Sequence, residues 1–205
     1  MKIPTPITHH LDFEDVYEPA EDSFLLLDAL EQDLEELKSS TFCLEIGSGS
    51  GIISVALASV IPTFVFSCDL NPKACQATVQ TASTNKQKNL DVIQTDFLTG
   101  FPVKSKFDLI VCNPPYVATI EDETKHSDIF ASWAGGVHGR NLTDILIEKL
   151  PQLLSDHGCA YIVVEQCNRP QEVKAKAEEM NFSAEFVLSR KAGREFLQIL
   201  KIRKN

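Results

Sequence analysis

The fold class of this chain is indicated by one stretch, Thr41-Phe42-Cys43-Leu44-Glu45-Ile46-Gly47-Ser48-Gly49-Ser50-Gly51. Its first six residues form a short apolar run of strand type, and three glycines follow at every second position. An apolar periodic run over residues 52–61 then predicts a helix, which Pro62 ends. A strand, a glycine-rich loop and a helix in this order are typical of the first unit of a nucleotide-binding α/β domain. Glycines suit such a loop because the backbone can turn tightly and approach a ligand without Cβ clashes.

The spacing of Gly47, Gly49 and Gly51 and the acid at Glu45 indicate the kind of ligand. The dinucleotide pattern is Gly-x-Gly-x-x-Gly, in which a helix N-terminus receives a pyrophosphate. Here the pattern is Gly-x-Gly-x-Gly, and an acid two residues before the first glycine would repel a pyrophosphate. S-adenosylmethionine (SAM) has no phosphate and carries an ammonium and a sulfonium group. The loop therefore favours SAM over NAD as the cofactor.

Acids also follow the next two predicted strands. The strand over residues 63–68 leads into Asp69, where a carboxylate can accept hydrogen bonds from both ribose hydroxyls. The strand over residues 90–94 is followed by Asp96 and Phe97, which could bind an adenine amino group and pack on the base. Each acid alone also fits a solvated strand end or a helix N-cap. Three acids at three successive strand ends, on one edge of a parallel sheet, favour a ligand site.

A second motif, Asn113-Pro114-Pro115-Tyr116, comes directly after the apolar run of residues 107–112. Each proline fixes its φ and lacks an N–H, so we expect the backbone carbonyls before and between them to be free to accept hydrogen bonds. Asn113 adds a side-chain carbonyl, and Tyr116 adds a flat face for stacking. These groups would form a cradle for a planar group that carries an NH2, either a carboxamide or the amino group of a base. On its own the motif also fits an ordinary loop.

The rest of the chain alternates between strand and helix patterns. This alternation predicts one α/β domain over residues 1–205, with a mostly parallel sheet and helices on both faces. We expect strands near residues 41–46, 63–68, 90–94, 107–112, 158–164, 182–189 and 195–201, and helices near 20–38, 51–61, 72–84, 143–154 and 170–180. Residues 117–140 lack clear periodicity, and we expect them to form a substrate lid, with an unstructured insertion as the alternative.

The composition narrows the function classes. The chain has 205 residues, 43% of them hydrophobic, and a formal net charge of −10, which fits one soluble domain and no membrane span. Proteins that bind nucleic acid need clustered Lys and Arg, and only short C-terminal clusters occur here. The six cysteines include no C-x-x-C pair. We therefore expect reduced thiols, no metal site and a location in the cytoplasm or the nucleus.

Together these motifs resemble those of the HemK-like glutamine methyltransferases, which modify peptide-chain release factors. The resemblance is greatest to the eukaryotic and archaeal branch, which lacks the extra N-terminal helical domain. It extends over nearly the whole chain, and three further stretches carry it: Val16-Tyr17-Glu18-Pro19-Ala20-Glu21-Asp22-Ser23-Phe24, Trp133-Ala134-Gly135-Gly136 with Gly139-Arg140, and Ser189-Arg190-Lys191-Ala192-Gly193-Arg194-Glu195. It implies a Rossmann-like class I SAM-dependent methyltransferase fold, with a seven-stranded sheet whose final strand inserts antiparallel.

The resemblance also implies roles for individual residues. The SAM pocket would be lined by Ser23, Glu45, Gly47, Gly49, Asp69, Asp96, Phe97 and Asn113. Ser23 stands where the family usually has threonine, and it would close over the cofactor with the segment of residues 1–40. The target glutamine would be bound by Asn113, Pro114, Pro115 and Tyr116, of which Asn113, Pro114 and Tyr116 would act in catalysis.

The members of this family most similar to the chain act as heterodimers with a small zinc-binding activator protein. Their substrate is the class 1 translation termination factor, methylated on the glutamine of its Gly-Gly-Gln loop, so the resemblance implies the same partner and substrate. Two other functions fit parts of the pattern. An adenine amino-methyltransferase acting on DNA or RNA would use the same cradle, but the net negative charge argues against it. A non-catalytic SAM-binding scaffold would tolerate loss of catalytic residues, and no catalytic residue is lost.

Overall fold

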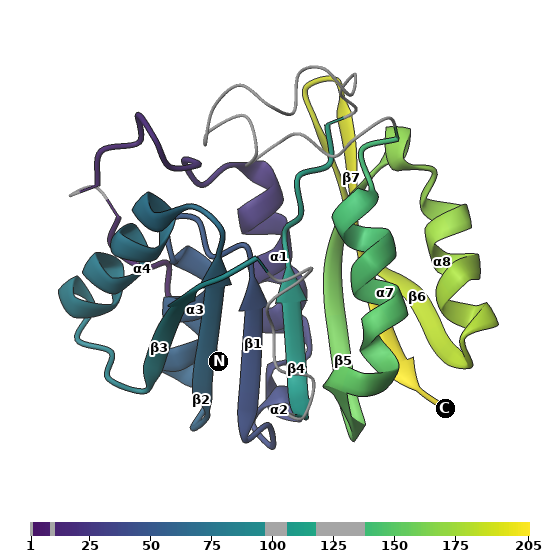
Figure 1. The fold of residues 1–205 in the computed structure, drawn as a ribbon, viewed down its shortest axis with the longest axis horizontal. Helices are drawn as coiled ribbons and strands as arrows, with labels where there is room; N and C mark the ends of the chain where they lie inside the picture. The colour runs from purple at the N-terminus through teal and green to yellow at the C-terminus, as the bar shows by residue number, and fades with distance from the viewer. Residues whose placement is uncertain (1, 9–10, 97–105, 118–137) are drawn as a thin grey trace.

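The computed structural model describes residues 2–8, 11–96, 106–117 and 138–205. In this part of the chain, seven strands form one sheet in the order β3-β2-β1-β4-β5-β7-β6 (Figure 1). The strands are β1 (Phe42–Ile46), β2 (Phe64–Asp69), β3 (Leu90–Gln94), β4 (Phe107–Cys112), β5 (Leu154–Glu165), β6 (Phe182–Ala192) and β7 (Glu195–Lys204). Every predicted strand is therefore present.

The sheet is mostly parallel, as the alternation of strands and helices predicts. β1 pairs in parallel with β2 and β4, β2 pairs with β3, and β4 pairs with β5. β7 runs antiparallel between β5 and β6. This topology confirms the expected Rossmann-like class I arrangement with its inserted antiparallel strand.

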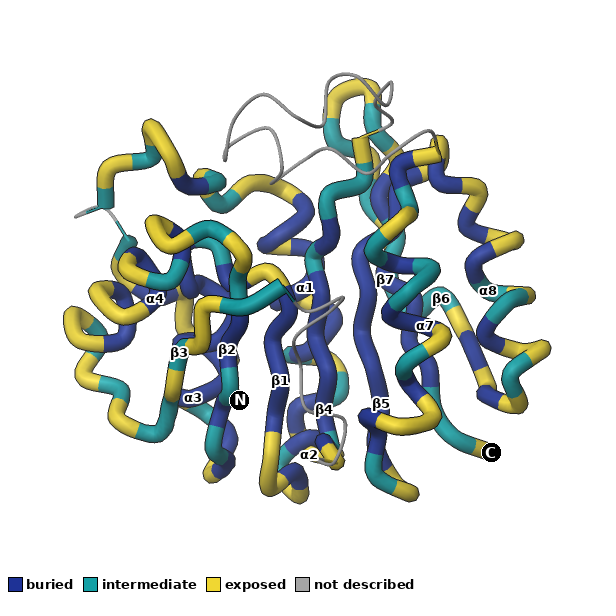
Figure 2. The backbone as a smooth tube through the Cα atoms, in the orientation of Figure 1, coloured by how far each residue is buried: buried dark blue, intermediate teal, exposed yellow. Residues whose placement is uncertain are grey.

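Two apolar cores, one on each face of the sheet, hold the layers together. In β1, Cys43 packs into one core and Leu44 into the other, because successive side chains of a strand point to opposite faces. A strand buried on both faces reads as a continuous apolar run, which is how residues 41–46 appear in the sequence. Figure 2 shows the central strands as almost entirely buried.

Helices cover both faces of the sheet (Figure 1). The helices α1 (Glu21–Gln32), α2 (Leu34–Leu37) and α3 (Ile52–Val60) contribute to the first core. The helices α7 (Asn141–Leu153) and α8 (Pro170–Glu179) contribute to the second. The helix α4 (Pro72–Thr84) packs against β2, β3 and α3.

Two sequence predictions of element boundaries were wrong. The expected helix over residues 20–38 is interrupted at Asp33, whose backbone (φ −100°, ψ 11°) leaves the helical conformation. There the Asp33 carboxylate accepts hydrogen bonds from the Tyr161 hydroxyl and from the buried ammonium group of Lys201. β5 begins at Leu154, directly after α7, because Leu154 already pairs with Phe107 of β4. In both places a contact distant in sequence overrides the local pattern.

Two other expectations concern residues outside the described part of the chain. Phe97 belongs to this group, as do residues 118–137 of the expected substrate lid.

None of the helices in the described part of the chain combines the length and the hydropathy that a membrane span requires. All six cysteines are free thiols, and burial raises the pKa of Cys43 and of Cys68 to about 12.

Candidate active site

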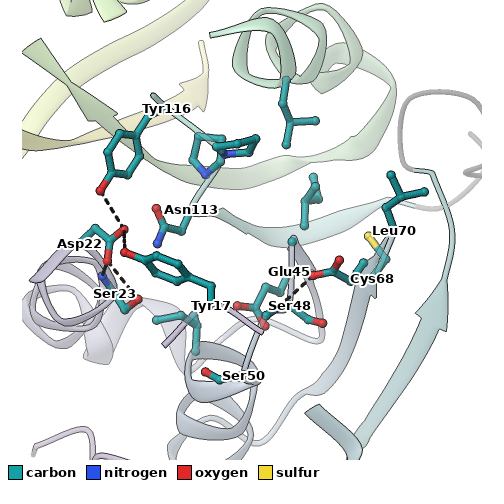
Figure 3. A pocket seen from close by; sticks show the side chains of 18 of the residues that line it. Tyr17, Asp22, Ser23, Glu45, Ser48, Ser50, Cys68, Leu70, Asn113 and Tyr116 are labelled. Atoms are coloured by element: carbon teal, nitrogen blue, oxygen red, sulfur yellow. Dashed lines mark hydrogen bonds between the residues drawn. The ribbon is translucent and has the colours of Figure 1, made fainter. Parts of the chain in front are cut away.

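A pocket of about 460 Å³ lies at the carboxyl ends of the parallel strands (Figure 3). Its lining comes from the loop after β1, the end of β2, the residues after β3 and the motif after β4. Ligands of open α/β sheets bind outside this edge because the loops there are free to diverge. Residues from α1, α3 and α7 and from the start of β7 also line it.

The backbone of the glycine loop at the base of the pocket is held by hydrogen bonds and by close packing. The amides of Gly47 and Ser48 both donate to the Cys68 carbonyl, at 2.9 and 3.1 Å. Gly51 has a φ of +79°, and a Cβ at this position would lie 2.8 Å from Cα of Thr78 in α4. Only glycine allows this close approach of α4 to the loop.

Side chains of α4 fasten the loop from outside the pocket. The Thr78 hydroxyl lies 2.9 Å from Oγ of Ser48, and the Thr81 hydroxyl donates to the Ser50 carbonyl at 2.8 Å. Both threonines are completely buried. The loop shape therefore depends on α4 as well as on its own glycines.

Asp69, at the end of β2, joins the glycine loop to the next turn. Its carboxylate accepts hydrogen bonds from the amide of Gly49 at 3.0 Å and from the amide of Asn71 at 2.9 Å. Burial raises the pKa of Asp69, and these amide donors oppose the rise. A carboxylate has about four acceptor sites, so the oxygens retain capacity for hydroxyl donors on a ligand.

Glu45 is almost fully buried at the end of β1. One carboxyl oxygen accepts from the Ser54 amide at 3.1 Å, from the Ser54 hydroxyl and from the Ser67 hydroxyl at 3.1 Å. Burial raises the pKa of this carboxyl group to about 8, although the hydrogen bonds from Ser54 and Ser67 favour ionisation. A nearby cation would lower this pKa again, since an opposite charge favours the ionised form.

Asn113 presents a buried acceptor at the pocket. Its side-chain oxygen Oδ1 has no hydrogen-bond partner among the described residues, although the atom is buried. A buried polar atom without a partner is costly, and most such atoms in proteins are satisfied. In Figure 3 the Asn113 side chain lies between the side chains of Tyr116 and Tyr17. This oxygen is therefore available for an N–H donor on a ligand.

The hydroxyl group of Tyr116 lies beside two acids and a second tyrosine. Its hydroxyl contacts Oδ2 of Asp22 at 3.2 Å and Oε2 of Glu195 at 3.4 Å. The Tyr17 hydroxyl donates to the same Asp22 oxygen at 2.9 Å. Burial and then the charge of Asp22 raise the pKa of both tyrosines above the ordinary value, so both remain protonated at neutral pH. Neither phenol can therefore act as a base in this arrangement.

The structure brings together the predicted site residues that it describes. Residues from both predicted groups line one pocket: Ser23, Glu45, Gly47, Gly49, Asp69, Asp96, Asn113, Pro114, Pro115 and Tyr116. Phe97 lies outside the described residues, and the role of each lining residue stays a prediction. Sequence reasoning assigned no role to Tyr17, Asp22 or Glu195, which also line the pocket. All three lie in sequence stretches that carry the family resemblance, so the sequence did contain a signal that they belong to the site.

The charges of the lining favour a cationic ligand. Its residues include the acids Asp22, Glu45, Asp69, Asp96 and Glu195, and no Lys, Arg or His is among the described lining residues. Such a wall would repel a phosphate group and suits a ligand with positive charge. No group of three or more His, Cys, Asp or Glu in the described part of the chain could bind a metal ion.

Comparison with known proteins agrees with this geometry. The family model "Methyltransferase small domain" matches residues 21–190. The human protein "Methyltransferase HEMK2" is 44% identical over 98% of this chain and 97% of its own length. In Schizosaccharomyces pombe, the "eRF1 methyltransferase catalytic subunit mtq2" is 38% identical over 97% of this chain and 94% of its own length.

A solved structure shares both the fold and the sequence pattern. It is the Mtq2-Trm112 complex of E. cuniculi, described as responsible for the methylation of the eRF1 translation termination factor. The matched chain is 29% identical and has a TM-score of 0.72, with 93% of this chain and 99% of that chain covered. The fold, the pocket and these relatives agree: the chain belongs to the eukaryotic HemK-like family of methyltransferases.

Proposed function

We propose that this chain is a SAM-dependent protein methyltransferase. It transfers a methyl group to the side-chain amide nitrogen of the glutamine in the Gly-Gly-Gln motif of a class 1 translation termination factor. The relatives named for eRF1 methylation support this substrate. The observation that carries the proposal is the buried Asn113 Oδ1, an acceptor without a partner among the described residues, at the wall of a SAM-type pocket.

The lining residues fit SAM. Gly47 and Gly49 would let the cofactor approach the backbone, and Asp69 would accept from its ribose hydroxyls. Asp96 would accept from the adenine amino group, and Ser23 would close the pocket from α1. The acids of the lining would provide negative potential for a sulfonium and an ammonium group, and the Glu45 carboxyl would ionise as the bound cation lowers its pKa. When bound, SAM supplies an electrophilic methyl group.

Asn113 and Pro114 would orient the target amide. A carboxamide nitrogen is a poor nucleophile because its lone pair is delocalised into the carbonyl group. Acceptors at the Asn113 side chain and the Pro114 carbonyl would hold both N–H bonds of the glutamine and favour a more pyramidal nitrogen. Orientation of this kind can supply roughly 7–11 kcal/mol of a barrier. Tyr116 would hold the amide plane from the other side.

Adenine is the rival acceptor, because its amino group could use the same cradle. The net charge of −10 and the acidic pocket lining disfavour a polyanionic substrate. Adenine methylation is therefore one of the outcomes that the methyl-transfer assay distinguishes.

A small activator protein, expected to bind zinc, is the proposed partner. The comparison structure is a complex with Trm112, which supports a heterodimer. In the described part of the chain β3 is at the edge of the sheet, and two apolar side chains there are exposed: Ile93 on β3 (43%) and Leu70 (60%), whose carbonyl contacts Gln94 of β3. An exposed apolar edge strand is a natural site for strand addition.

The free thiols of the chain fit a reducing compartment. We therefore propose that the complex is in the cytoplasm, with the nucleus as a second location.

Methyl transfer from labelled SAM tests the proposed function. The chain would be co-purified with the activator and offered four substrates: the wild-type termination factor, the factor with its Gly-Gly-Gln glutamine changed to alanine, DNA and RNA. Label on the wild-type factor alone is the expected result. Label on nucleic acid alone would replace the proposal with adenine methylation, and no label on any substrate, despite measurable SAM binding, would favour a scaffold.

A further inference from the structure

Tyr116 is anchored by a residue that lies outside the pocket lining and outside the Asn-Pro-Pro-Tyr motif. Its backbone carbonyl accepts a hydrogen bond from Nδ2 of Asn168 at 2.7 Å. Asn168 ends the short 3₁₀ helix η2 (Gln166–Asn168), which follows β5. The two residues are 52 positions apart in the sequence. The motif is therefore fastened to a distant turn of the chain.

The Asn168 amide group is directed into a cluster of three backbone carbonyls. Besides Tyr116, its Nδ2 lies 3.0 Å from the carbonyl oxygen of Gly139 and 3.2 Å from that of His138. Its Oδ1 accepts from the Glu165 amide at 2.8 Å, and only 2% of the residue is exposed. Carbonyl oxygens that face one another repel, and the two N–H donors of one amide offset this repulsion.

The backbone of Gly139 packs closely against the Tyr116 carbonyl and the Asn168 amide. Gly139 has a φ of +64°, and a Cβ there would lie 2.0 Å from the Tyr116 carbonyl oxygen and 2.6 Å from Nδ2 of Asn168. The backbone at Gly139 therefore passes directly against the end of the Asn-Pro-Pro-Tyr motif. A movement of the Asn168 amide would displace the Tyr116 carbonyl as well.

The same turn also reaches the other end of Tyr116. Glu165 accepts from the Cys167 amide at 2.6 Å and from the Phe196 amide at 3.0 Å. Phe196 follows Glu195, whose carboxylate contacts the Tyr116 hydroxyl. The turn of residues 165–168 is thus connected to the backbone carbonyl of Tyr116 directly and to its hydroxyl through β7.

We infer that Asn168 is a positioning residue for the proposed methyl transfer. By holding the Tyr116 carbonyl, it fixes the aromatic wall and, through the backbone, the acceptors at Asn113 and Pro114. The inference rests on the proposed function, and it adds a residue that does not line the pocket. Displacement of reacting groups by about 1 Å can lower a rate about 100-fold.

The substitution Asn168→Asp separates this role from a simple cap on the turn. A carboxylate retains the acceptor for the Glu165 amide but replaces the N–H donors with oxygens that face three carbonyls. If Asn168 acts only as the acceptor that caps η2, the variant will keep normal turnover. If Asn168 positions Tyr116, turnover will fall although the cap is retained.

Asn89→Asp provides a matched control. Nδ2 of Asn89 also bridges backbone carbonyls, at 3.1 Å from Ala58 and 2.8 Å from Thr63. Asn89 precedes β3, whereas the pocket residues Thr95 and Asp96 follow it, so the bridge lies at the opposite end of the strand. The same chemical change is therefore made far from the Asn-Pro-Pro-Tyr motif.

The experiment compares wild type, Asn168→Asp and Asn89→Asp as complexes with the activator. We expect kcat of Asn168→Asp on the termination factor to fall at least ~10-fold, with a smaller change in KM. SAM affinity by calorimetry should remain near that of wild type, and Asn89→Asp should retain its kcat. Equal kcat for wild type and Asn168→Asp would overturn the inference, as would equal losses of kcat in both variants.

Two further conditions keep the result interpretable. If Asn168→Asp does not fold, Asn168→Ala removes the donors without adding a charge, and the same split between kcat and SAM affinity applies. A wild-type complex that binds SAM but does not methylate the termination factor would refute the proposed function itself. An active wild type with an equally active Asn168 variant would refute only the positioning role.

Discussion

At the residue scale, each side chain at the pocket is defined by the partners it has and by those it lacks. Asp69 and Glu45 are engaged with the glycine loop and with Ser54 and Ser67, respectively. Asn113 has a buried oxygen with no partner in the described part of the chain. An acceptor that the fold leaves unsatisfied is the feature expected of a group reserved for a ligand.

Replacement of Asn113 tests this acceptor. We expect Asn113→Ala to lower the rate of methyl transfer at least ~100-fold, because the target amide loses its orientation. SAM affinity should fall far less, since the glycine loop and Asp69 are unchanged. Single-turnover kinetics with labelled SAM and calorimetry of SAM binding would measure the two effects. Turnover near that of wild type would exclude the proposed role of Asn113.

Glu45 makes the stability of the SAM-free chain depend on pH. Its pKa in the folded chain is about 8, against a value of 4.5 for an unperturbed glutamate, because burial disfavours the charged form. Between these two values the folded state binds more protons than the unfolded state. Its contribution to stability is therefore complete below pH 4.5 and is lost as the pH rises through 8.

Glu45→Gln should remove this pH dependence, because an amide does not ionise in this range. Urea denaturation midpoints of both proteins, measured without SAM at acidic and alkaline pH, would show it. We expect the wild-type midpoint to fall more than that of the variant as the pH rises. Parallel pH profiles for the two proteins would show that Glu45 does not titrate as described.

Among the elements, the shape of the glycine loop depends on helix α4. Gly51 packs against Cα of Thr78, while Thr78 and Thr81 hydrogen-bond to the loop between Ser48 and Ser50. The glycine loop and α4 should therefore move or unfold together. The position of Tyr116 depends in the same way on β7, because this strand places Glu195 beside the Tyr116 hydroxyl.

Gly51→Ala tests the contact between the loop and α4. A Cβ at this position meets Thr78 at 2.8 Å, and the backbone has a φ of +79°. We expect a loss of about 1–3 kcal/mol in the free energy of unfolding beyond that of a glycine with a similar φ, because the added Cβ would overlap Thr78. SAM affinity should decrease as well. Gly193→Ala is the control, since Gly193 also has a positive φ (+59°) but no atom within 4 Å of an added Cβ. Unchanged SAM binding in Gly51→Ala would show that the loop does not need this contact.

At the scale of the whole molecule, the sheet has an edge that the described part of the chain leaves exposed. β3 pairs only with β2 there, and Ile93 is 43% exposed. Edge strands with exposed apolar side chains favour association with other chains, and a charge on the edge opposes it. The proposed activator would cover this edge.

Ile93→Lys should separate solubility from partner binding. We expect the variant made alone to remain in solution better than the wild type and to bind the activator more weakly. Phe42→Lys is the matched control, because Phe42 is 45% exposed and lies at the start of the central strand β1. Size-exclusion chromatography of each chain, alone and with the activator, would measure both effects. Normal complex formation by Ile93→Lys would place the partner on another surface.

From the sequence alone one can predict the order of strands and helices, the glycine loop and the residues at the carboxyl ends of β1, β2 and β4. These features are local, because strand and helix periodicity, glycine spacing and the Asn-Pro-Pro-Tyr motif are each read within a short window. The motifs themselves indicated the acids and the Asn-Pro-Pro-Tyr group as ligand residues, and the family resemblance added Ser23, the substrate and the partner. All of the assigned residues that the structure describes line one pocket.

Which distant groups hold these residues in place depends on the tertiary structure. The sequence contains no pattern that joins Tyr116 to Asn168, 52 positions away, or to Glu195, 79 positions away. The break of the first helix at Asp33 likewise depends on Tyr161 and Lys201, which are 128 and 168 positions distant. Such contacts arise from strand order and from the insertion of β7 between β5 and β6, which bring together segments that have no local relation in the chain.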